Sequence, residues 1–181
     1  CEQGDFLCCE EKVNLGLDNN TWGGGFSKLC KIPGEILRIH KHAIWEIPDN
    51  VKYEEAAVLD PICNAYKAVA QQAHLLPGQD VVVFGTGPLG LFSVQIAKIM
   101  GAVNIVMVGL DDDVATRFPV ALEVGATHVV NGSKEDVVAR CTEICGRDNL
   151  GLVIECSGAN IALKQAIEMT RPNAEIVRVG M

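Results

Sequence analysis

The sequence is poor in positive charge and has no long apolar run. Its 181 residues include 15 Lys and Arg against 23 Asp and Glu, a formal net charge of −8. No basic run or patch is present, which argues against a protein that binds nucleic acid or an anionic membrane. No stretch approaches the about 20 uninterrupted apolar residues of a transmembrane helix, and the first residues lack the pattern of a signal peptide. We therefore expect neither a membrane span nor a secretory signal.

The cysteines do not have the spacing of a disulfide framework. They stand at positions 1, 8, 9, 30, 63, 141, 145 and 156. Such frameworks are typical of small secreted domains, whereas 49% of this sequence is hydrophobic, which is ample for a sizeable core. Cys141 and Cys145 lie four residues apart on a predicted helix, and we interpret them as core positions. We expect reduced thiols in a cytoplasmic enzyme.

Residues 80–109 carry the most informative pattern. The apolar run Val81–Phe84 leads straight into Gly85–Gly90, which reads G-T-G-P-L-G. Apolar residues then recur at helical spacing as far as Met100, and a second apolar run follows at Ile105–Val108. A strand, a glycine turn, a helix and a strand within about 30 residues are the context in which G-x-G-x-x-G predicts a dinucleotide site. The alternative is a glycine turn in an ordinary α/β protein.

The residue types of this turn fit the binding of a pyrophosphate. Gly85 permits the tight turn, Gly87 lets the backbone approach the pyrophosphate, and Gly90 lets the helix pack close to the strand. The helix that begins near Pro88 and Leu89 presents free N–H groups and a partial positive charge to the same anion. We therefore predict these five residues as cofactor-binding.

Beyond residue 79, predicted strands and helices alternate. The strands are expected at 80–84, 104–108, 127–130, 151–155 and 175–179, and the helices near 88–100, 114–124, 135–145 and 160–170. This alternation predicts an α/β fold with a doubly wound parallel Rossmann sheet. Ligands bind beyond the carboxyl ends of such strands. The segments expected there are Gly85–Gly90, Gly109–Asp113, Cys156–Gly158 and Gly180.

Residues 1–60 have a different pattern, with short apolar runs and many turn formers. We predict strands at Phe26–Ile32, Ile36–Ile39 and Ala43–Ile47, which together indicate a β-rich module. Helical spacing begins near Tyr53, and two domains are expected, at 1–60 and 61–181. Because the chain does not begin with Met and ends where a strand runs out, we expect it to be a fragment of a longer protein.

Several short segments, taken in their order and spacing, resemble the zinc-containing medium-chain dehydrogenase family in its threonine dehydrogenase and sorbitol dehydrogenase branch. They include G-G-F-S-K, I-P-D-N-V and E-C-S-G. Their positions are Gly24–Lys28, Ile47–Val51, Leu59–Pro61, Asn64–Ala65, Val129–Asn131 and Glu155–Gly158. The resemblance implies that residues 1–60 are the tail of a GroES-like catalytic domain. It also implies that residues 61–181 are most of a dinucleotide-binding domain, truncated at its C-terminus.

The same resemblance implies an activity. In this family a secondary alcohol exchanges a hydride with a nicotinamide cofactor, and zinc assists by binding the substrate oxygen. The expected substrate is a polyol, a sugar derivative or a hydroxy amino acid such as threonine, and a homo-oligomer, dimer or tetramer, is expected. The family's catalytic Cys and His-Glu pair are absent here, so we expect no turnover from these residues alone. A zinc-free quinone or enoyl reductase and a non-catalytic dinucleotide-binding module remain alternatives.

The resemblance also implies metal ligands. Cys1 and Cys9 match the last two of four structural zinc ligands, whereas the spacing of Cys8 does not fit; the alternative is two ordinary thiols in a loop. Asp60 stands where the family carries an acidic residue that ligates the catalytic zinc or lies beside it. It could equally be the N-cap of a helix that begins at Pro61.

The coenzyme is indicated by the end of the second strand. Gly109 takes the place of the acidic residue that usually bonds the ribose of NAD. A glycine there, with Arg117 downstream, could admit the phosphate of NADP, but Asp111–Asp113 would repel it and Asp111 could reach the ribose. We expect NAD, with NADP as the alternative. Cys156, Val179 and Gly180 are expected beside the nicotinamide, with Cys156 not acting as a nucleophile.

Overall fold

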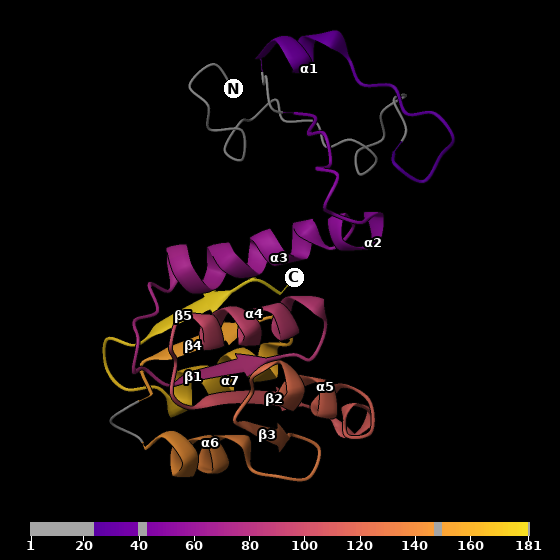
Figure 1. Ribbon diagram of the computed structural model, residues 1–181. Coiled ribbons are helices and arrows are strands. Elements are labelled where there is room, and N and C mark those ends of the chain that lie inside the picture. Colours follow the sequence, from indigo (N-terminus) through magenta and orange to yellow (C-terminus); the bar gives the residue numbers. More distant parts are fainter. Residues whose placement is uncertain (1–23, 40–42, 147–149, 181) are drawn as a thin grey trace. The chain divides into compact units, whose positions relative to one another are not determined.

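The structure is a computed structural model that describes residues 24–39, 43–146 and 150–180 (Figure 1). Contacts divide the chain into two units, Cys1–Tyr53 and Glu54–Met181. The sheet and the candidate site belong to the second unit.

The described part of the second unit contains a five-stranded parallel sheet in the order β3-β2-β1-β4-β5. The strands are β1 Val81–Phe84, β2 Ile105–Gly109, β3 His128–Asn131, β4 Leu152–Glu155 and β5 Glu175–Arg178. Between them lie α4 Pro88–Ile99, the 3₁₀ turn η2 Asp111–Asp113, α5 Arg117–Val124, α6 Val137–Cys145 and α7 Asn160–Met169. The predicted doubly wound sheet and its alternating elements are confirmed.

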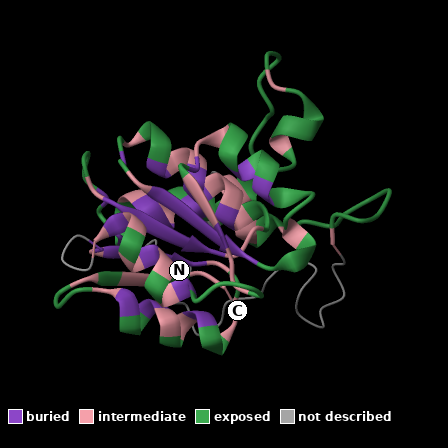
Figure 2. Cartoon of the chain, turned by 90° about the horizontal axis from the view of Figure 1, so that it is seen from below, coloured by how far each residue is buried: buried purple, intermediate pink, exposed green. Residues whose placement is uncertain are grey.

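Helices cover both faces of this sheet (Figures 1 and 2). Val81 and Val83 of β1 belong to a core cluster with residues of α4 and α5. Val82 and Phe84 point to the opposite face, into a cluster with residues of α6 and α7. Because side chains alternate along a strand, a strand covered on both faces is apolar throughout. This explains why β1, β2 and β4 are buried along their whole length.

Three helical elements lie between residue 53 and β1. They are α2 Tyr53–Ala56, α3 Leu59–Tyr66 and the π-helical segment η1 Lys67–Gln72. Ala68 and Val69 of η1 are buried in the same core cluster as α4. The helical spacing that the sequence shows from about residue 53 is confirmed.

The described residues of the first unit do not form the predicted strands. Gly34–Ile39 is a helix, α1, and the rest of 24–39 and 43–52 is neither helix nor strand. The strand predictions for 26–32, 36–39 and 43–47 are therefore wrong. A strand bonds only to a neighbouring strand, whereas a helix bonds within itself, and Glu35 in the first turn and Arg38 in the last suit the helix dipole. The assignment to a GroES-like domain stays a prediction.

Helix α4 packs directly on the turn that follows β1. A Cβ added at Gly90 would lie 1.8 Å from the carbonyl oxygen of Gly85 and 3.4 Å from the Cε of Met107. The first contact is with backbone, which cannot move aside without displacing the turn. The absence of a side chain at Gly90 therefore sets how closely α4 approaches β1.

We expect Gly90→Ala to lower the free energy of unfolding by about 2–4 kcal/mol, because the added methyl overlaps the Gly85 carbonyl. Urea unfolding followed by circular dichroism measures this change. Gly87→Ala is the matched control from the same turn, because its Cβ would meet nothing within 4 Å at an ordinary φ of −69°. Equal unfolding midpoints for the two variants would contradict the packing argument.

Candidate functional site

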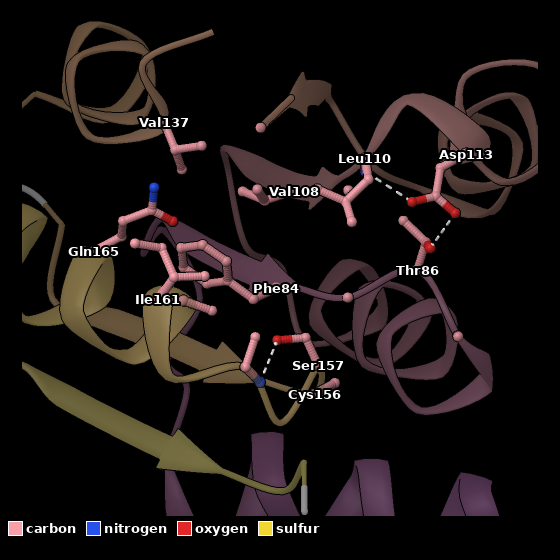
Figure 3. Close-up of a pocket in the computed structure, with 16 residues that line it drawn as sticks. Phe84, Thr86, Val108, Leu110, Asp113, Val137, Cys156, Ser157, Ile161 and Gln165 are labelled. Atoms are coloured by element: carbon pink, nitrogen blue, oxygen red, sulfur yellow. Dashed lines mark hydrogen bonds between the residues drawn. The ribbon is translucent and has the colours of Figure 1, made fainter. Parts of the chain in front are cut away.

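A cavity of about 450 Å³ opens at the carboxyl ends of β1, β2 and β4 (Figure 3). Its described lining consists of Phe84, Gly85, Thr86, Gly87, Val108, Gly109, Leu110, Asp113, Gly132, Val137, Cys156, Ser157, Ala159, Ile161, Ala162 and Gln165. The chain winds from β1 to β2 on one side and returns to β4 on the other. This reversal is the point at which open α/β sheets bind their ligands.

The turn after β1 forms one wall of this crevice. Gly85 has a φ of +94°, which an L side chain rarely adopts, and its N–H donates to the carbonyl of Val108 at 2.9 Å. A Cβ on Gly85 would lie 3.0 Å from the backbone nitrogen of Ser157. Gly85 therefore lets the β1 turn contact the loop that follows β4, and both segments line the crevice.

The N-terminus of α4 is open to the crevice. Gly87 is the N-cap, gives no side-chain cap, and is followed by Pro88 at the first helical position. The N–H groups of Leu89 and Gly90 precede the first intrahelical bond, which Leu91 makes to the Gly87 carbonyl at 3.0 Å. No atom lies within 4 Å of the place that a Gly87 Cβ would fill. The turn therefore leaves a cradle next to free amides, which fits an anion such as a diphosphate.

The loop after β4 is held by a buried carboxylate. Glu155 is fully buried, and its Oε1 accepts hydrogen bonds from the N–H of Ser157 at 2.6 Å and of Gly158 at 2.9 Å. It also accepts from Ser157 Oγ at 2.5 Å. The guanidinium of Arg178 lies 3.4 Å from Oε2 and donates to the Gly158 carbonyl at 3.0 Å. Burial makes these charge-assisted bonds strong, so the loop is fixed.

Cys156 lies in this loop and lines the crevice. Burial raises the pKa of its thiol to about 11, with a further increase from Glu155 and an opposing effect of the Ser93 hydroxyl. The Ser93 Oγ lies 3.9 Å from the sulfur. A thiol with this pKa is protonated near neutral pH, and only the thiolate is a good nucleophile. The structure therefore agrees with a non-nucleophilic role for Cys156.

The end of β2 forms the opposite wall. Asp113 in η2 turns its carboxylate toward the crevice, where Oδ1 accepts from Thr86 Oγ1 at 2.6 Å and Oδ2 from the N–H of Leu110 at 2.8 Å (Figure 3). Among the described lining residues, Asp113 is the one with a charged side chain. From the three adjacent aspartates the sequence analysis chose Asp111 and not Asp113, whereas the carboxylate that lines the cavity is that of Asp113.

Asp111 and Arg117 are not among the lining residues. Asp111 accepts a hydrogen bond from Asn131 Nδ2 at 2.8 Å and lies 3.1 Å from the Nζ of Lys134. The bonds from Asn131 and Lys134 lower the pKa of Asp111. Its carboxylate therefore joins the β2 end to the β3 end. Arg117 is the first residue of α5.

The remaining predicted cofactor residues divide into three groups. Gly85, Gly87, Gly109 and Cys156 line the cavity, and Pro88, Leu89 and Gly90 form the first turn of α4 beside it. Val179 and Gly180 do not line it. Their N–H groups donate to the Glu155 carbonyl at 2.8 and 3.0 Å, which places them next to the start of the β4 loop.

Sequence reasoning missed the side of the crevice that α6 and α7 provide. Ile161 and Gln165 are four residues apart, so they lie on one face of α7, and Val137 opens α6 (Figure 3). No motif marks these positions. Their only signal is their place just after the carboxyl ends of β3 and β4, where loops and helix starts line such crevices.

The described residues contain no group of three or more His, Cys, Asp or Glu side chains that could hold a metal ion. Cys1 and Cys9 lie outside the described residues. Asp60 is exposed, and its Oδ2 and backbone carbonyl both accept from Asn64 Nδ2, at 3.2 and 3.0 Å. Helix α3 begins at Leu59 with Val58 as its N-cap, so the alternative of Asp60 as N-cap is wrong. Pro61 is tolerated inside the first turn because no N–H there has an intrahelical acceptor.

Cys141 and Cys145 are buried in the core cluster of α6 and α7, as predicted. Burial raises the pKa of each thiol to about 12.

No helix in the described part of the chain has the length and apolar character needed to cross a membrane.

The known proteins to which the chain is similar in sequence include several dehydrogenases. The chain is 82% identical over 181 residues to the uncharacterized zinc-type alcohol dehydrogenase-like protein YdjL of Escherichia coli (strain K12), covering 100% of this chain and 51% of that protein. It is 28% identical over 181 residues to L-threonine 3-dehydrogenase of Pyrococcus furiosus, covering 100% of this chain and 48% of the relative. The chain thus spans about half the length of the curated relatives it matches.

A solved structure shows the same fold. The 2R,3R-butanediol dehydrogenase from Bacillus subtilis superposes with a TM-score of 0.65 at 33% sequence identity, over 76% of this chain and 38% of that one. Residues 88–181, from the start of α4 onward, match the family described as zinc-binding dehydrogenase. This match extends over more than half of the sequence and includes β2 to β5 of the crevice-forming sheet. The chain therefore belongs to the zinc-binding dehydrogenase family.

Proposed function

We propose that the crevice binds a nicotinamide dinucleotide, NAD in preference to NADP, and that the whole protein is an alcohol dehydrogenase. The observation that carries this proposal is the open cradle at Gly87. It lies next to the unbonded amides of Leu89 and Gly90, at the reversal point of the parallel sheet. Family membership supports the same reading.

The residues of the chain have distinct roles in this proposal. The amides of Leu89 and Gly90 hold the pyrophosphate at the positive end of α4. The Cys156–Gly158 loop, which Glu155 holds in place, and the apolar side chain of Ile161 shape the half of the crevice beside β4. The bound nicotinamide supplies the hydride acceptor or donor. Cys156 stays a neutral thiol and contributes shape, not covalent chemistry.

The substrate is proposed as a secondary alcohol: a polyol, a sugar derivative or a hydroxy amino acid such as threonine. The names of two relatives, L-threonine 3-dehydrogenase and 2R,3R-butanediol dehydrogenase, support this class. Zinc assistance is proposed from the family description, with Cys1, Cys9 and Asp60 as the candidate ligands in this chain. Among the described residues no group of three or more His, Cys, Asp or Glu side chains forms a zinc site. We also propose that the boundary between the two domains lies near residue 60. The whole protein is proposed to be a cytoplasmic homo-oligomer.

Gly87→Ala tests dinucleotide binding. Its methyl group would fill the cradle, so the Kd for NAD should rise by at least about tenfold, while the melting temperature stays unchanged because the methyl meets no protein atom. Titration calorimetry measures the first quantity and thermal unfolding the second. Gly34→Ala is the control, since its Cβ also meets nothing within 4 Å but lies outside the crevice lining. Unchanged NAD affinity in Gly87→Ala would refute the cradle as the pyrophosphate site.

Cys156 should react slowly with thiol reagents. With a pKa of about 11 its thiolate is scarce at pH 8, so brief iodoacetamide treatment should label the exposed Cys30 and Cys63 first. Labelling of Cys156 should then rise by about tenfold for each pH unit until the pH approaches its pKa. Peptide mass spectrometry reads each site separately. Labelling of Cys156 as fast as Cys63 at pH 8 would show an activated thiol and contradict its proposed role.

Chelation of the full-length protein tests the zinc-assisted activity. Oxidation of secondary alcohols, followed by the absorbance of the reduced nicotinamide, should stop after metal removal and return when zinc is added. Activity that a chelator leaves intact would instead indicate a zinc-free reductase. NAD binding without turnover of any alcohol would indicate a non-catalytic dinucleotide-binding module.

A further inference from the structure

The end of β2 has no room for the acidic side chain that usually meets the ribose. A Cβ added at Gly109 would lie 2.6 Å from the Phe118 ring, 2.6 Å from the Thr86 methyl and 2.7 Å from Asp113 Oδ2. Three separate segments therefore fill the space of a side chain at this position. One of the three groups is itself a carboxylate.

The carboxylate of Asp113 thus lies where the side chain of an acidic residue at position 109 would begin. Asp113 reaches back from η2, four residues further along the chain, and stands about 20 residues after the glycine turn, as the ribose-binding acid of dinucleotide sites does. Its carboxylate lines the same cavity as Gly85 and Gly87. Gly109 is needed because a side chain there would displace the Asp113 carboxylate.

Two hydrogen bonds orient this carboxylate. Thr86 Oγ1, in the glycine turn, donates to Oδ1, and the N–H of Leu110 donates to Oδ2 (Figure 3). Each oxygen retains further capacity to accept a bond. The Thr86 bond also joins the turn proposed for the pyrophosphate to Asp113. It therefore fixes the distance between the proposed pyrophosphate site and the proposed ribose contact.

The charges around the crevice favour a ligand hydroxyl over a ligand phosphate at this point. The described lining residues include no cationic side chain, and their one charged group is the negative carboxylate of Asp113. Lys134 lies beside Asp111, and Arg117 is not in the lining. A 2′-phosphate placed here would face a carboxylate without a cation to balance it.

We propose that Asp113 is the specificity-determining residue of the site: it accepts hydrogen bonds from the adenosine ribose hydroxyls and rejects a 2′-phosphate. This inference rests on the proposed function, because it assigns one contact of the same dinucleotide. It replaces Asp111 as the aspartate expected to reach the ribose.

Asp113→Asn tests the inference, because the amide keeps the size of the side chain and removes its charge. The amide can still accept from Leu110 and donate to the Thr86 hydroxyl, so the fold is retained. The ratio of the Kd for NADP to the Kd for NAD should fall by about tenfold to a hundredfold. Titration of the protein with each dinucleotide measures it, and thermal unfolding checks the fold.

Asp112→Asn is the matched control. Asp112 lies in the same 3₁₀ turn, is exposed and does not line the cavity, so the variant removes an equal charge outside the site. Its Kd ratio should stay within about twofold of the wild type, because salt screens exposed charges. An equal shift in both variants would mean that net charge, and not the position of Asp113, sets the preference, and would overturn the inference.

Thr86→Val provides a second, independent variant if Asp113→Asn does not fold. It keeps the shape of the turn and the charge of Asp113 but removes the donor to Oδ1, so the ratio should fall by about threefold to tenfold. An unchanged ratio in a folded variant would overturn the role of Asp113 and leave the proposed function intact. A wild type that prefers NADP would overturn both the role of Asp113 and the proposed preference for NAD, and would leave dinucleotide binding intact. A wild type that binds neither dinucleotide would overturn the proposed function itself.

Discussion

The contact between the backbone of α4 and the turn after β1 is the constraint on which the rest of the site depends. Gly90 packs so closely on the Gly85 carbonyl that no side chain fits between them. This packing sets the position of the α4 N-terminus above the carboxyl end of β1. The free amides of the helix therefore lie next to the open space at Gly87, and this arrangement supports the proposed binding of a diphosphate.

The other walls of the crevice are fixed from distant parts of the chain. Glu155 holds the β4 loop through bonds to Ser157 and Gly158, and Arg178 of β5 connects to both its carboxylate and the loop. On the opposite side, Thr86 holds Asp113. These two walls thus each combine a buried or oriented carboxylate with backbone donors, so the polar groups of the mainly apolar crevice are few and each has a defined position.

The sequence predicted much of the fold because its patterns are local. Runs of apolar residues at β1 and β4, helical spacing in α4 and the glycine turn each depend on residues within a few positions of one another. The strand predictions were wrong at 26–32, 36–39 and 43–47. The short apolar run at 36–39 fits a strand or a single helical turn equally well. Only the presence or absence of a neighbouring strand decides between them, and that depends on residues distant in sequence.

The site shows the same difference between features that local sequence patterns predict and features that depend on residues distant in sequence. The residues themselves determined the glycine turn, the free helix N-terminus and the location of the crevice at the strand ends, because these follow from backbone geometry that short motifs encode. Tertiary structure decided which of three adjacent aspartates faces the crevice, since Asp113 meets Thr86 across 27 positions while Asp111 pairs with Lys134. It also decided why residue 109 is glycine, because the space of its side chain is filled by groups from three separate segments.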